Sequence, residues 1–194
     1  ISIIKEFSMA TKKVKSAGSE KVQYVWAAIR IALALIFLWA FADKMFGLGN
    51  TTCQTVDPKT KVSTVQVMCS KAVLKGNSPT KGFLGNSAKG PLKATYNKLA
   101  GNKVVDFLFM AGLLLIGLAL LTGVGIKVAA VSGALLMIMM WTVVLPPANN
   151  PVLDDHIVYA LALLGIKLSN DNQVWGLGSW WKKQSIVKKY PILA

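Results

Sequence analysis

The chain has few of the residues that form metal or redox centres. Among its 194 residues are two cysteines and one histidine, His156. It contains no CxxC motif, no second histidine for a metal and no ligand set for haem or an iron–sulfur cluster. We therefore predict no metal ion and no cofactor held by metal ligands or covalently.

Acidic residues and arginine are also scarce. Eight Asp and Glu face 22 Lys and Arg, which gives a formal net charge of +14, and Arg30 is the only arginine. A basic chain can bind nucleic acid, but such proteins combine clustered Lys and Arg with a recognisable binding domain, and this sequence shows none. We predict no nucleic-acid partner and assign the positive charge to membrane lipid head groups.

The apolar residues are concentrated in runs long enough to cross a bilayer. Hydrophobic residues make up 54% of the chain, and three near-continuous runs cover residues 22–42, 104–121 and 128–145. About 20 helical residues cross a bilayer core. A fourth run, 154–168, reaches only about 22 Å and is short for a span.

These runs predict an all-α membrane protein in which residues 1–194 form one domain, a four-transmembrane-helix bundle. The predicted spans are residues 22–45, 104–122, 127–145 and 154–169. Small residues four apart, such as Ala130 and Ala134, are expected where the helices pack closely.

The long connection of residues 47–103 contains both cysteines, Cys53 and Cys69. Lysine counts leave the topology ambiguous, but a disulfide between this pair suits an oxidising compartment. The alternative is two unpaired thiols in a reduced loop. We predict a disulfide-closed loop outside the cytoplasm and both chain termini inside it. Within the loop, residues 61–69 favour a short strand or hairpin, and 92–100 an amphipathic helix that covers the bundle.

Arg30 lies inside the first apolar run, in the half predicted to face the cytoplasm. A charge at this depth costs several kcal/mol unless it pairs or meets water, which makes Arg30 a candidate functional residue. The alternative is that its side chain extends to anionic lipid in the inner leaflet.

Polar residues at the predicted outer helix ends form the candidate site. The catalytic candidates are Lys44, Asp106, Asp155 and His156. The candidates for contact with a quinone or another ligand are Arg30, Trp39, Trp141 and Tyr159. We expect the first four to converge, because charges within a membrane are stabilised by one another. The alternative is that they cap helices and form structural ion pairs.

Three segments carry a resemblance to a known family. They are RIALALIFLWAFADKMFG at 30–47, NSPTKGFL at 77–84 followed by Gly90-Pro91, and NPVLDDHIVYA at 150–160. Together and in this order they resemble the DoxX/DoxD membrane proteins. The chain departs from the simplest pattern of that family in its two-cysteine insert and its lysine-rich ends.

The resemblance implies a four-helix subunit of a redox or respiratory complex in the prokaryotic inner membrane, with other subunits as partners and quinone or lipid as ligand. We expect an accessory or quinone-proximal role. The alternative is a DoxD-type subunit of a thiosulfate:quinone oxidoreductase. Whether the chain is itself an enzyme stays open at this point.

Overall fold

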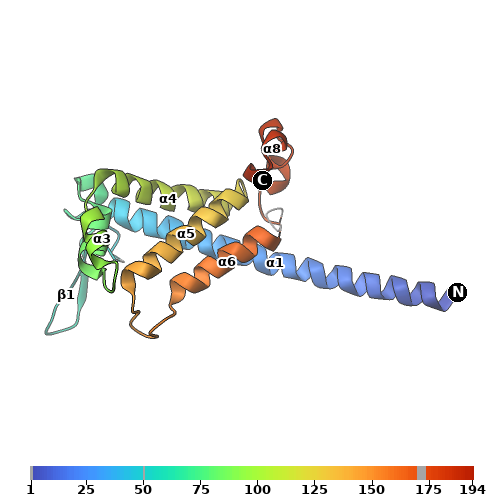
Figure 1. The fold of residues 1–194 in the computed structure, drawn as a ribbon, viewed down its shortest axis with the longest axis horizontal. Helices are drawn as coiled ribbons and strands as arrows, with labels where there is room; N and C mark the ends of the chain where they lie inside the picture. Colours follow the sequence, from blue (N-terminus) through green and yellow to red (C-terminus); the bar gives the residue numbers. More distant parts are fainter. Residues whose placement is uncertain (1, 50, 170–173) are drawn as a thin grey trace.

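The computed structural model describes residues 2–49, 51–169 and 174–194, with side chains from residue 21 onward. Four helices lie side by side and form its body (Figure 1). They are α1 (Ser2–Phe46), α4 (Lys103–Thr122), α5 (Ile126–Val144) and α6 (Asp155–Ser169). Helix α1 packs against α4 and α6, while α5 packs against α4 and α6.

Three segments of these helices are long and apolar enough to cross a membrane. They are Lys21–Phe46, Lys103–Thr122 and Ile126–Val144. The prediction of a helical, multi-pass membrane protein is confirmed at this level. Helix α6 forms where the fourth run predicted it, but with 15 residues it is not among the three.

The helix ends follow from local chemistry. The Asn102 side chain accepts hydrogen bonds from the amides of Val104 and Val105 and so caps the start of α4. Gly123 ends α4 with a φ of 80°, a left-handed conformation that glycine adopts without a steric penalty. The chain therefore reverses within a few residues and enters α5 antiparallel to α4.

The core lies on the inward faces of the helices. Its most buried members include Ala34, Phe37, Leu120, Ala130 and Leu163. The outward faces carry exposed apolar side chains on every helix of the bundle, such as Leu35, Phe107, Leu115, Leu135 and Leu161. A surface of this kind suits a lipid environment, since soluble domains rarely expose so much contiguous apolar area.

Small residues permit the closest helix contacts, as predicted. A Cβ atom added to Gly117 would lie 2.7 Å from Cγ of Leu38, and one on Gly133 would lie 3.0 Å from Cδ1 of Leu163. Gly112 faces open space instead. Close packing therefore uses selected small residues rather than all of them.

The connection between α1 and α4 folds over one end of the bundle, and we call residues 51–102 the cap (Figure 1). The disulfide Cys53–Cys69 closes its antiparallel hairpin of β1 (Gln54–Val56) and β2 (Ser63–Val65). The rest consists of η1 (Val73–Lys75), α2 (Pro79–Gly82), the π-helical turn η2 (Phe83–Ser87) and α3 (Lys93–Leu99). The predicted disulfide, hairpin and covering helix are all present.

The end of the chain lies at the opposite end of the bundle, and we call residues 174–194 the tail. It contains α7 (Gly178–Trp181), α8 (Ser185–Lys189) and η3 (Pro191–Leu193). The Leu177 amide donates to the Thr122 carbonyl at 2.7 Å, and the Lys127 amide donates to the Ala194 carbonyl at 3.1 Å. These bonds hold the tail against the turn between α4 and α5.

Candidate functional site

A cavity of about 360 Å³ lies between the cap and helices α4 and α5. Its walls are almost wholly apolar. The cap contributes Phe83, Leu84, Tyr96 and Leu99, while the helices contribute Leu108, Phe109, Leu136, Met139, Met140 and Val143. The cap therefore covers an apolar chamber beside the C-terminal half of α5.

A second cavity of about 420 Å³ adjoins this chamber and shares four lining residues with it, Pro79, Phe83, Phe109 and Met140. Its other walls are polar and carry two cations. They include Lys44, Thr51, Thr52, Lys71, Asn77 and Ser78. No carboxylate lines either cavity among the described residues. We call the two together the cap cavity, apolar at one end and positively charged at the other.

Lys44 is the only one of the predicted site residues that lines the cap cavity. Its ammonium nitrogen lies 5.9 Å from the centre of the Phe109 ring, within range of a cation–π interaction. Phe109 belongs to both parts of the cavity, so the charge sits where the polar and apolar parts meet. A ligand with a polar or anionic head and an apolar body fits this arrangement.

Two carboxylates hold the cap segments that form the polar part. Asp43 Oδ2 accepts hydrogen bonds from the Thr51 amide and hydroxyl, at 3.1 and 2.8 Å, and from the Thr52 amide at 3.1 Å. Asp106 Oδ1 accepts from the Ser78 hydroxyl at 2.8 Å and from the amide and hydroxyl of Thr80. Both acids therefore position the cavity wall.

The Asp154–His156 segment forms the start of α6. The His156 amide donates to Asp154 Oδ1 at 3.1 Å, and His156 Nδ1 lies 2.8 Å from Asp154 Oδ2 and 3.6 Å from Asp155 Oδ1. The three potential ligand atoms lie within 4.8 Å of one another, which is close enough for a metal ion. The contacts are also those of a helix cap, the alternative noted from the sequence.

The predicted convergence of Lys44, Asp106, Asp155 and His156 is not found. Within the described part of the chain, no hydrogen bond or ion pair joins these residues except the contact between Asp155 and His156. Asp106 bonds to cap hydroxyls and Lys44 lies over Phe109. Asp106 has its own hydrogen-bond donors in the cap, so it does not require a charged partner. A catalytic role for any of them stays a prediction.

Arg30 lies in the half of α1 that is remote from the cap and is only 1% exposed. Its Nη1 donates to the carbonyls of Leu120 and Leu121, and its Nη2 donates to those of Val174 and Trp175 at 2.9 and 3.0 Å. The extension of Arg30 into lipid, one of the two readings from the sequence, is therefore wrong. Its guanidinium joins α1, the end of α4 and the tail.

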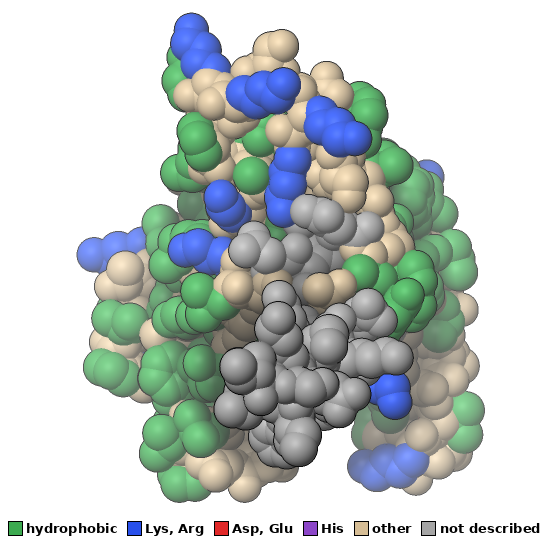
Figure 2. Space-filling view, turned by 90° about the vertical axis from the view of Figure 1, so that its right-hand side faces the viewer, with side chains coloured by type: hydrophobic (Ala, Val, Ile, Leu, Met, Phe, Trp, Pro, Cys, Tyr) green, Lys and Arg blue, Asp and Glu red, His purple; other side chains and the backbone are tan. Residues whose placement is uncertain are grey.

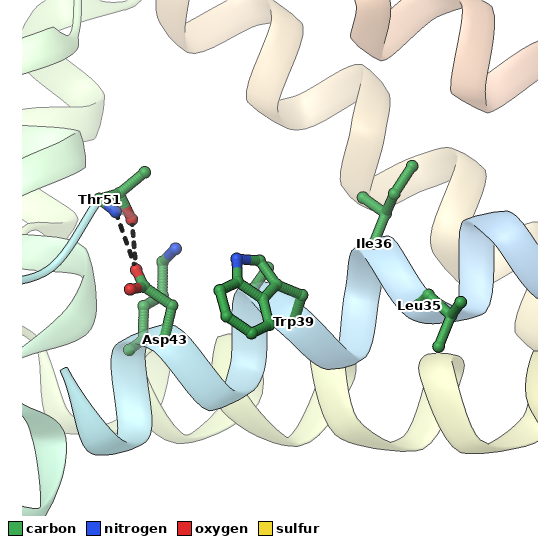
Figure 3. A pocket seen from close by; sticks show the side chains of 7 residues that line it. Leu35, Ile36, Trp39, Asp43 and Thr51 are labelled. Atoms are coloured by element: carbon green, nitrogen blue, oxygen red, sulfur yellow. Dashed lines mark hydrogen bonds between the residues drawn. The ribbon is translucent and has the colours of Figure 1, made fainter. Parts of the chain in front are cut away.

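The aromatic ligand candidates are spread over the molecule. Trp39 is 51% exposed and lies in an open groove along α1 with Asp43 and Thr51 (Figure 3). The Trp141 indole donates to the Val152 carbonyl at 2.8 Å, and Tyr159 packs beside the core. None of the three lines the cap cavity.

The apolar wall of the cavity, which includes Phe83, Tyr96 and Met139, was not predicted as part of a site from the sequence. The sequence did contain an indication of this wall. The amphipathic helix predicted at 92–100 was expected to cover the bundle, and its apolar face must pack against an apolar surface of the bundle. Which face of α5 lies opposite that helix cannot be predicted from the sequence.

The chain matches no protein-family model, no curated protein and no solved structure. The resemblance to DoxX/DoxD proteins therefore stays a prediction from short sequence segments.

Proposed function

We propose that this protein is an integral membrane subunit of a redox or respiratory complex, which holds a quinone next to its partner subunits. The observation that carries the proposal is the cap cavity. It offers an apolar chamber for the ring and the start of an isoprenoid chain, and Lys44 as a hydrogen-bond donor at the polar end. A membrane lipid has the same amphipathic chemistry and is the competing ligand.

The proposal includes four membrane spans, with α6 as the fourth. Helix α6 starts after Asp154, at the cap end of the bundle. At the other end, Arg30 donates hydrogen bonds to the carbonyls of Val174 and Trp175, so the chain passes from one end to the other between these residues. About 22 Å of α6 at 1.5 Å per residue accounts for most of that passage. An even number of spans puts both termini on one side of the membrane, and the proposed side is the cytoplasmic side of a prokaryotic inner membrane.

The Cys53–Cys69 disulfide supports an extracytoplasmic cap, because structural disulfides persist in oxidising compartments. The quinone would then lie near the outer surface of the membrane. His156 and Asp155 remain candidates for proton transfer at the same end of the bundle.

A second candidate function is a DoxD-type subunit of a thiosulfate:quinone oxidoreductase. The observation in its favour is the pair Lys44 and Lys71 in a cavity lining without a carboxylate, since two cations attract a sulfur oxyanion. Thiosulfate-dependent quinone reduction by the purified protein would distinguish it from the accessory role.

The proposal is tested with a substitution that fills the apolar chamber with a larger, uncharged side chain. Leu136 lines the cavity, whereas its neighbour Leu135 is 58% exposed and is not part of the lining. Leu136→Trp should weaken binding of a short-chain quinone at least about tenfold, by equilibrium titration in nanodiscs, because the indole occupies the chamber. Leu135→Trp is the matched control and should bind like the wild type.

Equal affinity in Leu136→Trp, in a protein with wild-type thermal stability, would refute the cap cavity as the quinone site. Displacement of quinone by phospholipid but not the reverse would assign the cavity to lipid.

A further inference from the structure

The two ends of the molecule differ in their content of acidic residues. Every acidic side chain that the structure describes lies at the cap end: Asp43, Asp57, Asp106, Asp154 and Asp155. Glu6, Glu20 and Asp171 lie outside the described side chains. Figure 2 looks onto the opposite end, where Lys side chains gather over the tail and no acidic side chain is seen among the described residues.

The tail contributes four lysines to this end, Lys182, Lys183, Lys188 and Lys189, and the adjoining helices α5 and α6 contribute Lys127 and Lys167. Residues 174–194 contain no acidic residue. Burial, and then repulsion from Lys127, lowers the pKa of Lys182. The lysines therefore lack an anionic partner within the described part of the chain.

The tail also exposes large apolar side chains beside these cations. Trp175, Leu177, Trp180, Ile186, Tyr190 and Ile192 are each between 50% and 68% exposed. The tail has a small interior of its own, since Val187 is buried and the Trp181 indole donates to the Leu193 carbonyl at 2.6 Å. The exposed aromatic and aliphatic groups are thus presented by a folded unit.

The position of this unit is set by the membrane helices. Arg30 binds the carbonyls of Val174 and Trp175, and Lys127 Nζ donates to the Pro191 carbonyl at 3.1 Å. These contacts place the tail where α4 ends and α5 begins, which is where two candidate spans leave the membrane. Exposed Trp and Tyr next to Lys are typical of the boundary between acyl chains and head groups.

We propose that the tail is an interfacial lipid-binding unit, in which its four lysines bind the head groups of anionic phospholipids and Trp175 and Trp180 enter the acyl boundary. The occupant is a bilayer surface, because the cations are spread over the unit beside apolar groups and not gathered in a pocket. Each lysine near an anionic surface adds to the electrostatic attraction. This inference does not depend on the cap cavity, which lies at the other end of the bundle.

The experiment measures amide hydrogen exchange of residues 174–194 in nanodiscs of phosphatidylcholine alone or with added phosphatidylglycerol. We expect several-fold slower exchange with phosphatidylglycerol, and loss of this difference in the variant K182Q/K183Q/K188Q/K189Q. The matched control K59Q/K61Q/K75Q/K81Q removes four exposed cap lysines and should retain the difference.

Equal exchange of the wild-type tail in both lipid mixtures would overturn the proposal, as would loss of the difference in the cap control. Slow exchange seen only in native membranes, and dependent on another protein, would identify a protein partner instead and also overturn it. If the tail variant fails to fold, the wild-type comparison between the two lipid mixtures decides the question alone.

Discussion

The two ends of this bundle stabilise buried charge in opposite ways. At the cap end, the carboxylate of Asp43 is 1% exposed and accepts hydrogen bonds from loop amides and a hydroxyl. At the tail end, the guanidinium of Arg30 is equally buried and donates to four backbone carbonyls. In both cases backbone groups of a turn or helix end bind the buried charge.

The direction of α4 explains part of this difference. Its first turn lies at the cap end and contains Asp106, while its last carbonyls, at Leu120 and Leu121, lie at the tail end and bind Arg30. A helix presents free N–H groups at its start and free carbonyls at its end, so anions are favoured at the first and cations at the second. The buried charges of Asp43 and Arg30 thus bind the polar groups of loops and helix ends.

The largest expected effect is at Arg30. Arg30→Ala should lower the free energy of unfolding by about 4 kcal/mol, since each lost bond to a charged group contributes about 1.5–3 kcal/mol and removal of the buried charge offsets part of the loss. Arg30→Lys should lose less, because it keeps a donor but not the planar fork. Thermal unfolding in nanodiscs measures the loss of stability in each variant, and amide hydrogen exchange of the tail measures whether the tail is still held in place.

The matched control is Lys21→Ala, an exposed cation on the same helix, which should leave both readouts unchanged. A tail with wild-type exchange in Arg30→Ala would show that Arg30 does not hold it.

A smaller effect is expected at Asp43. Asp43→Ala removes the acceptor of three hydrogen bonds and should cost about 2–3 kcal/mol, with faster amide exchange at Thr51 and Thr52 but not in the tail. The exposed Asp57 is the comparison, since its carboxylate accepts two hydrogen bonds at the surface and Asp57→Ala should cost less than Asp43→Ala. Equal destabilisation by both substitutions would contradict the assigned role of Asp43.

The smallest effect concerns the pH response of the hairpin. The amides of Lys59 and Thr60 donate to Asp57 Oδ1, and these bonds lower the pKa of the Asp57 carboxyl. The stabilisation by these bonds is therefore present above the pKa that the Asp57 carboxyl has in the unfolded chain. It disappears as the pH falls through the lower pKa that this carboxyl has in the folded protein. The Lys59 and Thr60 amide resonances should report this loss only below about pH 4. Asp57→Asn should abolish the transition, and persistence of the transition in that variant would assign it elsewhere.

Much of the fold was predictable because its signals are local. Runs of apolar residues at 104–121 and 128–145 became α4 and α5, and the alternation near Val62 and Val65 became part of the hairpin. The disulfide was predicted from cysteine count and loop position alone. Helix length, strand alternation and turn chemistry depend on neighbouring residues, so they are readable in order along the chain.

The candidate site was less predictable. Lys44 lies at the cap end, as expected, but its neighbours in the cavity come from α4, α5 and several separate cap segments. The hypothesis of a polar cluster assumed that charges at one membrane depth pair with each other. It overlooked the hydroxyls of Ser78 and Thr80 and the amide of Thr51, which are closer partners.

The sequence by itself determined that this is a helical membrane protein with a disulfide-closed loop, because hydropathy and cysteine position are properties of single segments. Only the tertiary structure decided what surrounds the buried charges. Arg30 binds carbonyls 90 to 145 residues away, and any backbone carbonyl would serve chemically. Which carbonyls it binds depends on how α1, α4 and the tail pack against one another. That packing cannot be predicted from the residues near Arg30 in the sequence.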